Sequence, residues 1–218
     1  MLDFFLFMFF SVLETSSLFY LAFKIFKIDL YAKEIVFASL IMGFISYVIR
    51  FDYGLTGLDV FIQYILIFCF LWLLFRIHIF YAVIMTGTAY QAYMVIQTFL
   101  YLLGKSMGLY SLSFPFVTLA MYGLQLLTVV IISSIAYYIG RKRKGFDFIP
   151  DKTDAPIYAG RQEKILFALA FPSIIVVFLM VYILEHANHF FFLIPLCYAL
   201  LLFGYLYLSN KKDRGDVQ

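Results

Sequence analysis

The chain has 218 residues, of which 65% are hydrophobic and only 13% charged, and its mean hydropathy is +0.97. An ordinary soluble domain is roughly 45–50% apolar and about 25% charged, so this chain has too few polar residues to cover a water-facing exterior. We therefore predict an all-α integral membrane protein whose solvent is the lipid bilayer. The net charge of +3 does not indicate a nucleic-acid partner, because the basic residues lie beside apolar segments.

Seven apolar runs are long enough to be transmembrane helices. A hydrocarbon layer of roughly 30 Å requires about 20 helical residues. We predict helices over 3–23, 35–49, 58–75, 79–103, 110–139, 165–184 and 190–208. The first run lacks the basic start and the small-residue cleavage site of a signal peptide, so we expect it to remain in the mature protein.

The distribution of Lys and Arg predicts the orientation. Fourteen of the 16 basic residues follow the first, third, fifth and seventh runs, and only Arg50 and Lys105 follow the others. Cytoplasmic loops hold basic residues preferentially, so we predict the N-terminus outside and the C-terminus in the cytoplasm. The expected location is the cell membrane, as a multi-pass protein of a bacterial plasma membrane.

One polar segment, 141–164, divides the predicted helices into five and two. The expected organisation is a five-helix membrane bundle (1–140), a basic cytoplasmic loop (141–164), a two-helix membrane segment (165–208) and a cytoplasmic tail (209–218). The loop begins with a basic cluster, Arg141, Lys142, Arg143 and Lys144. We expect this cluster to set the topology, and binding of anionic lipid headgroups is the alternative.

Glu14 is the most informative single residue, because a carboxylate inside hydrocarbon costs at least a few kcal/mol unless it faces a partner or a cavity. It is expected to point into the bundle, either to contact a ligand or relay a proton, or simply to be hydrogen-bonded. In the fourth run, polar side chains at 86, 90, 93 and 97 recur on one helical face.

These polar residues predict an inward-facing site. The candidate ligand-binding residues are Glu14, Gln63, Tyr90, Gln91, Gln97 and Gln125. The alternative is a network of interhelical hydrogen bonds, each pair contributing about 0.6 kcal/mol.

No catalytic, metal or cofactor site is predicted, and the chain is not expected to be an enzyme. A cysteine peptidase needs a thiol next to an imidazole, and Cys69 and His78 would lie about 13 Å apart along a single helix. His186 and His189, with Glu185, offer only a weak metal site. We interpret Cys69 and Cys197 as small packing residues.

Two segments carry a family resemblance, FCFLWLLFRIHIFYAVIMTGTAYQAYMVIQ (68–97) and YYIGRKRKGFDFIPD (137–151). With the layout of five helices, a basic loop and two helices, the chain resembles the membrane sensor region of accessory-gene-regulator type histidine kinases, which detect secreted peptide pheromones. The resemblance implies a small peptide ligand and a kinase partner. Those kinases continue into phosphoacceptor-histidine and ATP-binding regions that this sequence does not contain. Either the protein is a sensor-like chain that works without a kinase region of its own, with any cytoplasmic output coming from another chain, or the sequence is an excised or degenerate portion of such a sensor.

The function predicted from the sequence is that of a membrane sensor or receptor that binds a small peptide or apolar ligand and signals through a partner. Two alternatives remain open. One is a small transporter or transporter subunit in which Glu14 titrates, and the other is a structural partner of a kinase or an exporter. The expected protein partners are a kinase, another membrane protein or, in a homo-oligomer, a second copy of the chain.

Overall fold

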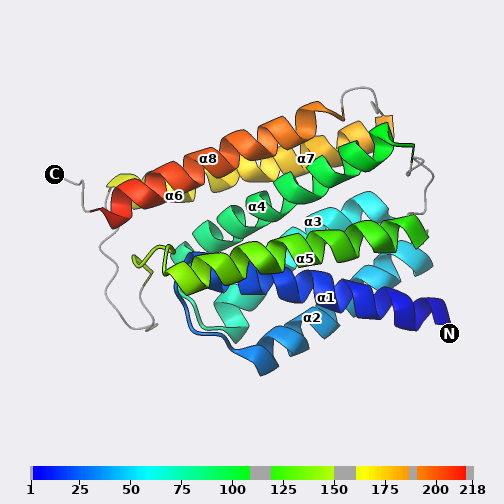
Figure 1. Cartoon of the computed structure of the whole chain (residues 1–218), viewed down its shortest axis with the longest axis horizontal. Helices are drawn as coiled ribbons and strands as arrows, with labels where there is room; N and C mark the ends of the chain where they lie inside the picture. Colours follow the sequence, from blue (N-terminus) through cyan, green and yellow to red (C-terminus); the bar gives the residue numbers. More distant parts are fainter. Residues whose placement is uncertain (1, 109–118, 150–160, 187–190, 215–218) are drawn as a thin grey trace.

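The structure is a computed structural model that describes residues 2–108, 119–149, 161–186 and 191–214. Throughout these ranges the secondary structure is helical and contains no strand. The helices are α1 (Leu2–Ile25), α2 (Ala32–Tyr47), α3 (Thr56–Cys69), α4 (Ile79–Ser106), α5 (Leu119–Lys142), α6 (Arg161–Ala168), α7 (Ala170–His186) and α8 (Leu193–Asp213) (Figure 1).

Seven helices are long and apolar enough to cross a membrane, which confirms the predicted number of spans. Large apolar side chains such as Phe171, Leu200 and Phe203 are about two-thirds exposed, at 67%, 73% and 69%. An exterior of this kind is stable in hydrocarbon and unfavourable in water. The described part of the chain is therefore that of a polytopic membrane protein.

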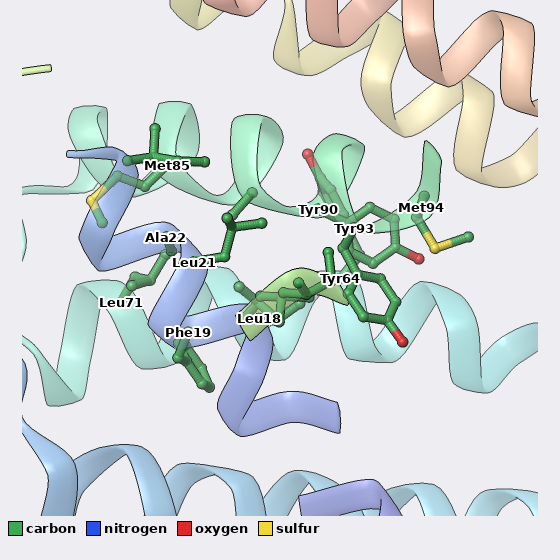
Figure 2. Close-up of a cluster of buried hydrophobic side chains, with 14 of the residues drawn as sticks. Leu18, Phe19, Leu21, Ala22, Tyr64, Leu71, Met85, Tyr90, Tyr93 and Met94 are labelled. Carbon is green, nitrogen blue, oxygen red and sulfur yellow. The ribbon is translucent and has the colours of Figure 1, made fainter. Parts of the chain in front are cut away.

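The central helix is α4. In its most apolar stretch 67% of the residues are buried, whereas the corresponding value for the other spans is between 22% and 33%. It packs against α8, α1 and α5, while α1 also packs against α2 and α5. Figure 2 shows Leu18 and Leu21 of α1 beside Met85 and Tyr90 of α4 in the buried cluster. Polar residues on α4 therefore face other helices rather than lipid.

The second span is longer than predicted at both ends, whereas the third agrees with its predicted bounds to within two residues, and each ends in a wider helical segment. α2 continues through η1 (Val48–Asp52) and α3 through η2 (Phe70–Leu74), giving spans of Ala32–Asp52 and Thr56–Leu74. In η1 the amide of Tyr53 donates to the carbonyl of Val48, five residues earlier, at 3.3 Å. Lys33, Glu34, Arg50 and Asp52, which flank the predicted run 35–49, lie inside the helical span near its two ends.

Helices also extend into both ends of the predicted 141–164 loop. Arg141 and Lys142 belong to the last turn of α5, Arg143 follows with a positive φ of 51°, and α6 begins at Arg161. Residues 150–160 of this loop, and residues 110–118 of the predicted fifth span, lie outside the described ranges. The short break between α6 and α7 is explained by Pro172, whose ring cannot accommodate a helical carbonyl at Ala168.

The segment that follows α5 packs on the end of α1. The amide of Phe146 donates to the carbonyl of Ile25 at 2.7 Å, and Lys27 lies 3.9 Å from Asp147. A Cβ at Gly145 would lie 2.6 Å from the carbonyl oxygen of Lys24, so only glycine permits this approach. Two basic segments that the charge distribution assigns to the cytoplasm thus lie at the same end of the bundle. The start of α1 and the end of α8 lie at opposite ends of the bundle (Figure 1).

Candidate ligand-binding cavity

A cavity of about 220 Å³ lies inside the helical bundle. Its walls come from α1, α2 and η1, α3, α4, α5 and α7. The lining residues fall between 7 and 18 on α1, 42 and 50 on α2 and η1, and 90 and 101 on α4. Most of them belong to the half of the bundle in which α1 begins, which is the half that the basic residues assign to the outside, and Leu18, Ile67 and Tyr90 lie just beyond the middle of their spans.

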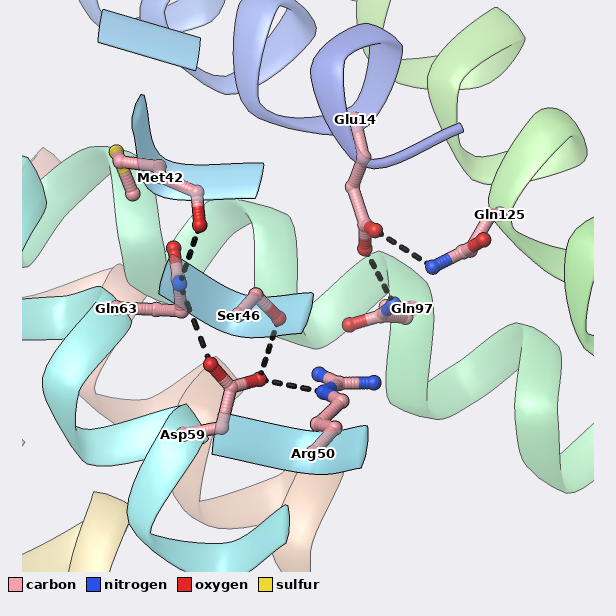
Figure 3. A network of polar contacts seen from close by, with 8 residues as sticks. All are labelled: Glu14, Met42, Ser46, Arg50, Asp59, Gln63, Gln97 and Gln125. Atoms are coloured by element: carbon pink, nitrogen blue, oxygen red, sulfur yellow. Dashed lines mark hydrogen bonds and ion pairs between the residues drawn. The ribbon is translucent and has the colours of Figure 1, made fainter. Parts of the chain in front are cut away.

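Glu14 is held at the cavity wall by donors from two other helices. The Tyr93 hydroxyl donates to Oε1 of Glu14, and Gln97 Nε2 donates to the same oxygen at 2.9 Å. Gln125 Nε2 of α5 donates to Oε2 at 2.9 Å. Figure 3 shows Gln97 and Gln125 reaching Glu14 from separate helices. The carboxyl group therefore ties α1 to α4 and α5 through neutral donors.

Helical spacing explains why these side chains meet. Tyr93 and Gln97 are four residues apart on α4, so they lie one above the other on the same face. On α1, Ser11 and Leu18 line the cavity with Glu14 at three- and four-residue spacing. Because a polar side chain in hydrocarbon needs a partner, this arrangement removes most of the cost of placing a carboxyl group in the span.

A second polar cluster lies at the same cavity and is centred on Asp59, whose side chain is fully buried. Arg50 Nε donates to Asp59 Oδ2 at 2.5 Å, and Ser46 Oγ donates to the same oxygen at 2.9 Å. Gln63 Nε2 lies 3.2 Å from Asp59 Oδ1 and also donates to the Met42 carbonyl at 3.1 Å (Figure 3). The Arg50 side chain is 26% exposed, so the cluster runs from a partly accessible guanidinium to a buried carboxylate.

Five of the six candidate residues line the cavity: Glu14, Gln63, Tyr90, Gln97 and Gln125. The structure does not bring Gln91 to this cavity. Its side chain is fully buried, and its amide has no hydrogen-bond partner among the described residues. It lies one position from Tyr90, a rotation of about 100° around α4, which turns it away from the face that the polar spacing indicates.

Sequence reasoning missed Asp59, Arg50 and Ser46. Asp59 gives the same signal as Glu14, because it is a carboxylate inside an apolar run, but its position near the start of that run suggests a flanking charge. Arg50 falls in a predicted loop between two spans. Its placement depends on η1, and no feature of the sequence predicts that widened turn.

The expected separation of Cys69 and His78 rests on a wrong assumption, because the two residues do not share a helix. Cys69 ends α3, whereas His78 precedes α4 and its Nδ1 accepts a hydrogen bond from the amide of Phe80 at 3.2 Å. His78 therefore caps α4. His189 lies outside the described ranges, and the residues that the structure describes contain no group of three metal-ligating side chains.

The fold and the cavity together define a polytopic α-helical membrane protein with a polar site in its helical core. Comparisons of the chain with protein-family models, with curated proteins and with solved structures found no match.

Proposed function

We propose that this protein is a sensor or receptor of a bacterial plasma membrane, with its N-terminus outside. It binds a small peptide or other amphipathic ligand in the cavity and signals through a partner chain. The observation that supports this proposal best is the cavity of about 220 Å³ with the Glu14 carboxyl group at its wall. Ionisable residues inside membrane spans are costly and are most often retained at functional sites.

The geometry supports a sensor because one ligand would touch several helices at once. Glu14 belongs to α1, Tyr93 and Gln97 to α4, and Gln125 to α5, and the cavity is also lined by Met180 of α7. A ligand that favours one arrangement of these helices shifts the population toward that arrangement by its differential affinity. The resemblance to peptide-pheromone sensors supports the same function and suggests a kinase as the partner.

Affinity selection from a peptide library tests the proposal and does not require the natural ligand. Purified protein in phosphatidylcholine nanodiscs is incubated with a synthetic library of short amphipathic peptides, and the retained peptides are identified by mass spectrometry. We expect wild-type protein to retain peptides that Glu14→Ala and empty nanodiscs do not retain. The matched control is Glu34→Gln, which removes a carboxylate in the first turn of α2, at the opposite end of the second span from Arg50 of η1.

Retention of the same peptides by the wild-type protein, Glu14→Ala and Glu34→Gln would exclude Glu14 from the binding site. Failure of the wild-type protein to retain more than empty nanodiscs would remove the receptor proposal.

A small transporter is the second candidate, and Glu14 also supports it. A buried carboxyl group beside a cavity is the arrangement that proton-coupled carriers use. Sealed vesicles with an imposed pH gradient distinguish the two functions. A transporter moves protons, or a peptide retained in the selection, only when Glu14 is present, whereas a sensor binds the peptide without flux.

A further inference from the structure

We infer that the cavity selects a ligand with a positively charged amine or guanidinium on an aromatic or aliphatic body, and that the cation binds beside Glu14. This inference rests on the proposed function and names the chemical class of its ligand.

The first argument is the distribution of charge. Arg50 already has a partner, because its Nε lies 2.5 Å from Asp59, and its guanidinium carbon lies 6.0 Å from the centroid of the Phe7 ring. Glu14 accepts hydrogen bonds only from neutral groups, and no salt bridge joins it to a basic residue of the described chain. With both carboxyl groups ionised, two carboxylates and one guanidinium give the site a formal charge of −1, and a bound cation favours that ionised form of Glu14. In a low-dielectric interior such a site favours a cation.

The second argument is the surplus of hydrogen-bond acceptors. Gln125 uses its Nε2 for Glu14, and its Oε1 is a buried oxygen with no partner among the residues described. Buried acceptors are normally paired, so an unpaired one at a cavity wall is a position for a donor from outside the chain. An ammonium group has three donors and no acceptor, so it can donate to Glu14 at the cavity wall, and it reaches Gln125 Oε1 when the amide of Gln125 turns toward the cavity.

The third argument is the aromatic wall. The rings that line the cavity are those of Phe7, Tyr90, Tyr93, Tyr101 and Phe191. Cations are attracted to aromatic faces within about 6 Å of the ring centroid. These rings also provide apolar surface for the body of the ligand. The site therefore combines a carboxylate with aromatic faces, which suits an organic cation better than a hydrated metal ion.

The volume limits the size of the bound group. A dry protein cavity of about 150 Å³ accepts benzene, and this cavity measures about 220 Å³. One aromatic ring with a short amine chain fits this space. For a peptide ligand, the cavity thus accommodates one residue, either a basic side chain or an N-terminal residue with its amine.

The test uses three probes of similar size and different charge: phenethylamine, phenethyl alcohol and 3-phenylpropionate. Binding to protein in phosphatidylcholine nanodiscs is measured by saturation-transfer NMR and by calorimetry, with empty nanodiscs subtracted. We expect phenethylamine to bind about tenfold more tightly than the alcohol, and the propionate to bind most weakly. The preference for the amine is expected to disappear in Glu14→Gln and to persist in Glu34→Gln.

Each other outcome has a defined meaning. Equal binding of the amine and the alcohol to wild-type protein would overturn the charge inference and leave the cavity as a ligand site. Tighter binding of the propionate would overturn it in favour of Arg50 as the recognising group. Binding of none of the probes above the nanodisc background would overturn both this inference and a ligand role for the cavity. The wild-type comparison decides among these outcomes even where Glu14→Gln is too unstable to purify.

Discussion

Removal of the Asp59 carboxylate is expected to destabilise the protein by about 4 kcal/mol. Asp59→Ala deletes the acceptor for Arg50, Ser46 and Gln63 and leaves Arg50 without its counter-ion. Breaking a buried ion pair from one side costs about 3–5 kcal/mol, and two neutral hydrogen bonds in a membrane add about 0.6 kcal/mol each. The 26% exposure of the Arg50 side chain lets water and headgroups solvate part of the orphaned charge, so we take the lower end of that range.

A double-mutant cycle separates the ion pair from the loss of packing. The free energy of unfolding is measured by circular dichroism during titration of dodecylmaltoside micelles with sodium dodecyl sulfate. We expect the double variant, Arg50→Leu with Asp59→Leu, to lose less unfolding free energy than the sum of the losses in the two single variants. The difference, which is the coupling energy, is expected to be about 2 kcal/mol. Additive losses would refute the reasoning, because they would mean that the two charges do not stabilise each other.

Two further predictions concern helix packing and orientation. Gly87→Ala is expected to cost about 2 kcal/mol in the same unfolding assay, because the new Cβ would lie 2.6 Å from Cζ of Tyr205 and over-packed cores lose typically 1–3 kcal/mol. Tyr205→Leu in the Gly87→Ala background restores most of the loss if this contact is the cause. The orientation is tested with single cysteines in a chain without its native cysteines. A cysteine at Ser106 is expected to react with an impermeant maleimide added outside the cell, and a cysteine at Lys144 is expected to react only after permeabilisation. Labelling of both from one side would contradict the orientation.

The membrane class and the number of spans were predictable from the sequence, because apolar length between charges is a strong and local signal. Glu14, Gln97 and Gln125 were also predictable as interior residues, since a polar side chain in a span has to face protein. Their convergence on one carboxyl group was not, because it depends on which helices are neighbours. Gln91 shows the limit of the same argument. Polar character alone does not say which side of a fully surrounded helix faces a cavity.

The boundaries of the second span were less predictable, because charged residues near helix ends resemble the ends themselves. Arg50 and Asp52 belong to η1, in which the hydrogen bonds widen and the chain makes an additional turn. That turn brings Arg50 to Asp59 of the next helix. The ion pair between Arg50 and Asp59 therefore depends on backbone hydrogen bonding and on the hairpin between α2 and α3, and the apolar pattern of the sequence predicts neither.

The packing of the 143–149 segment on α1 means that this one helix connects the cavity to the basic segment. Glu14 and Ile25 are separated by 11 residues of one uninterrupted helix, about 17 Å along its axis. At the cavity α1 is held by the hydrogen bonds to Glu14. At its other end it is held by the hydrogen bond from Phe146 to the Ile25 carbonyl and by the close approach of Gly145. Under the function proposed above, a tilt or rotation of α1 imposed at Glu14 would therefore also move the basic 143–149 segment that packs on the other end of this helix.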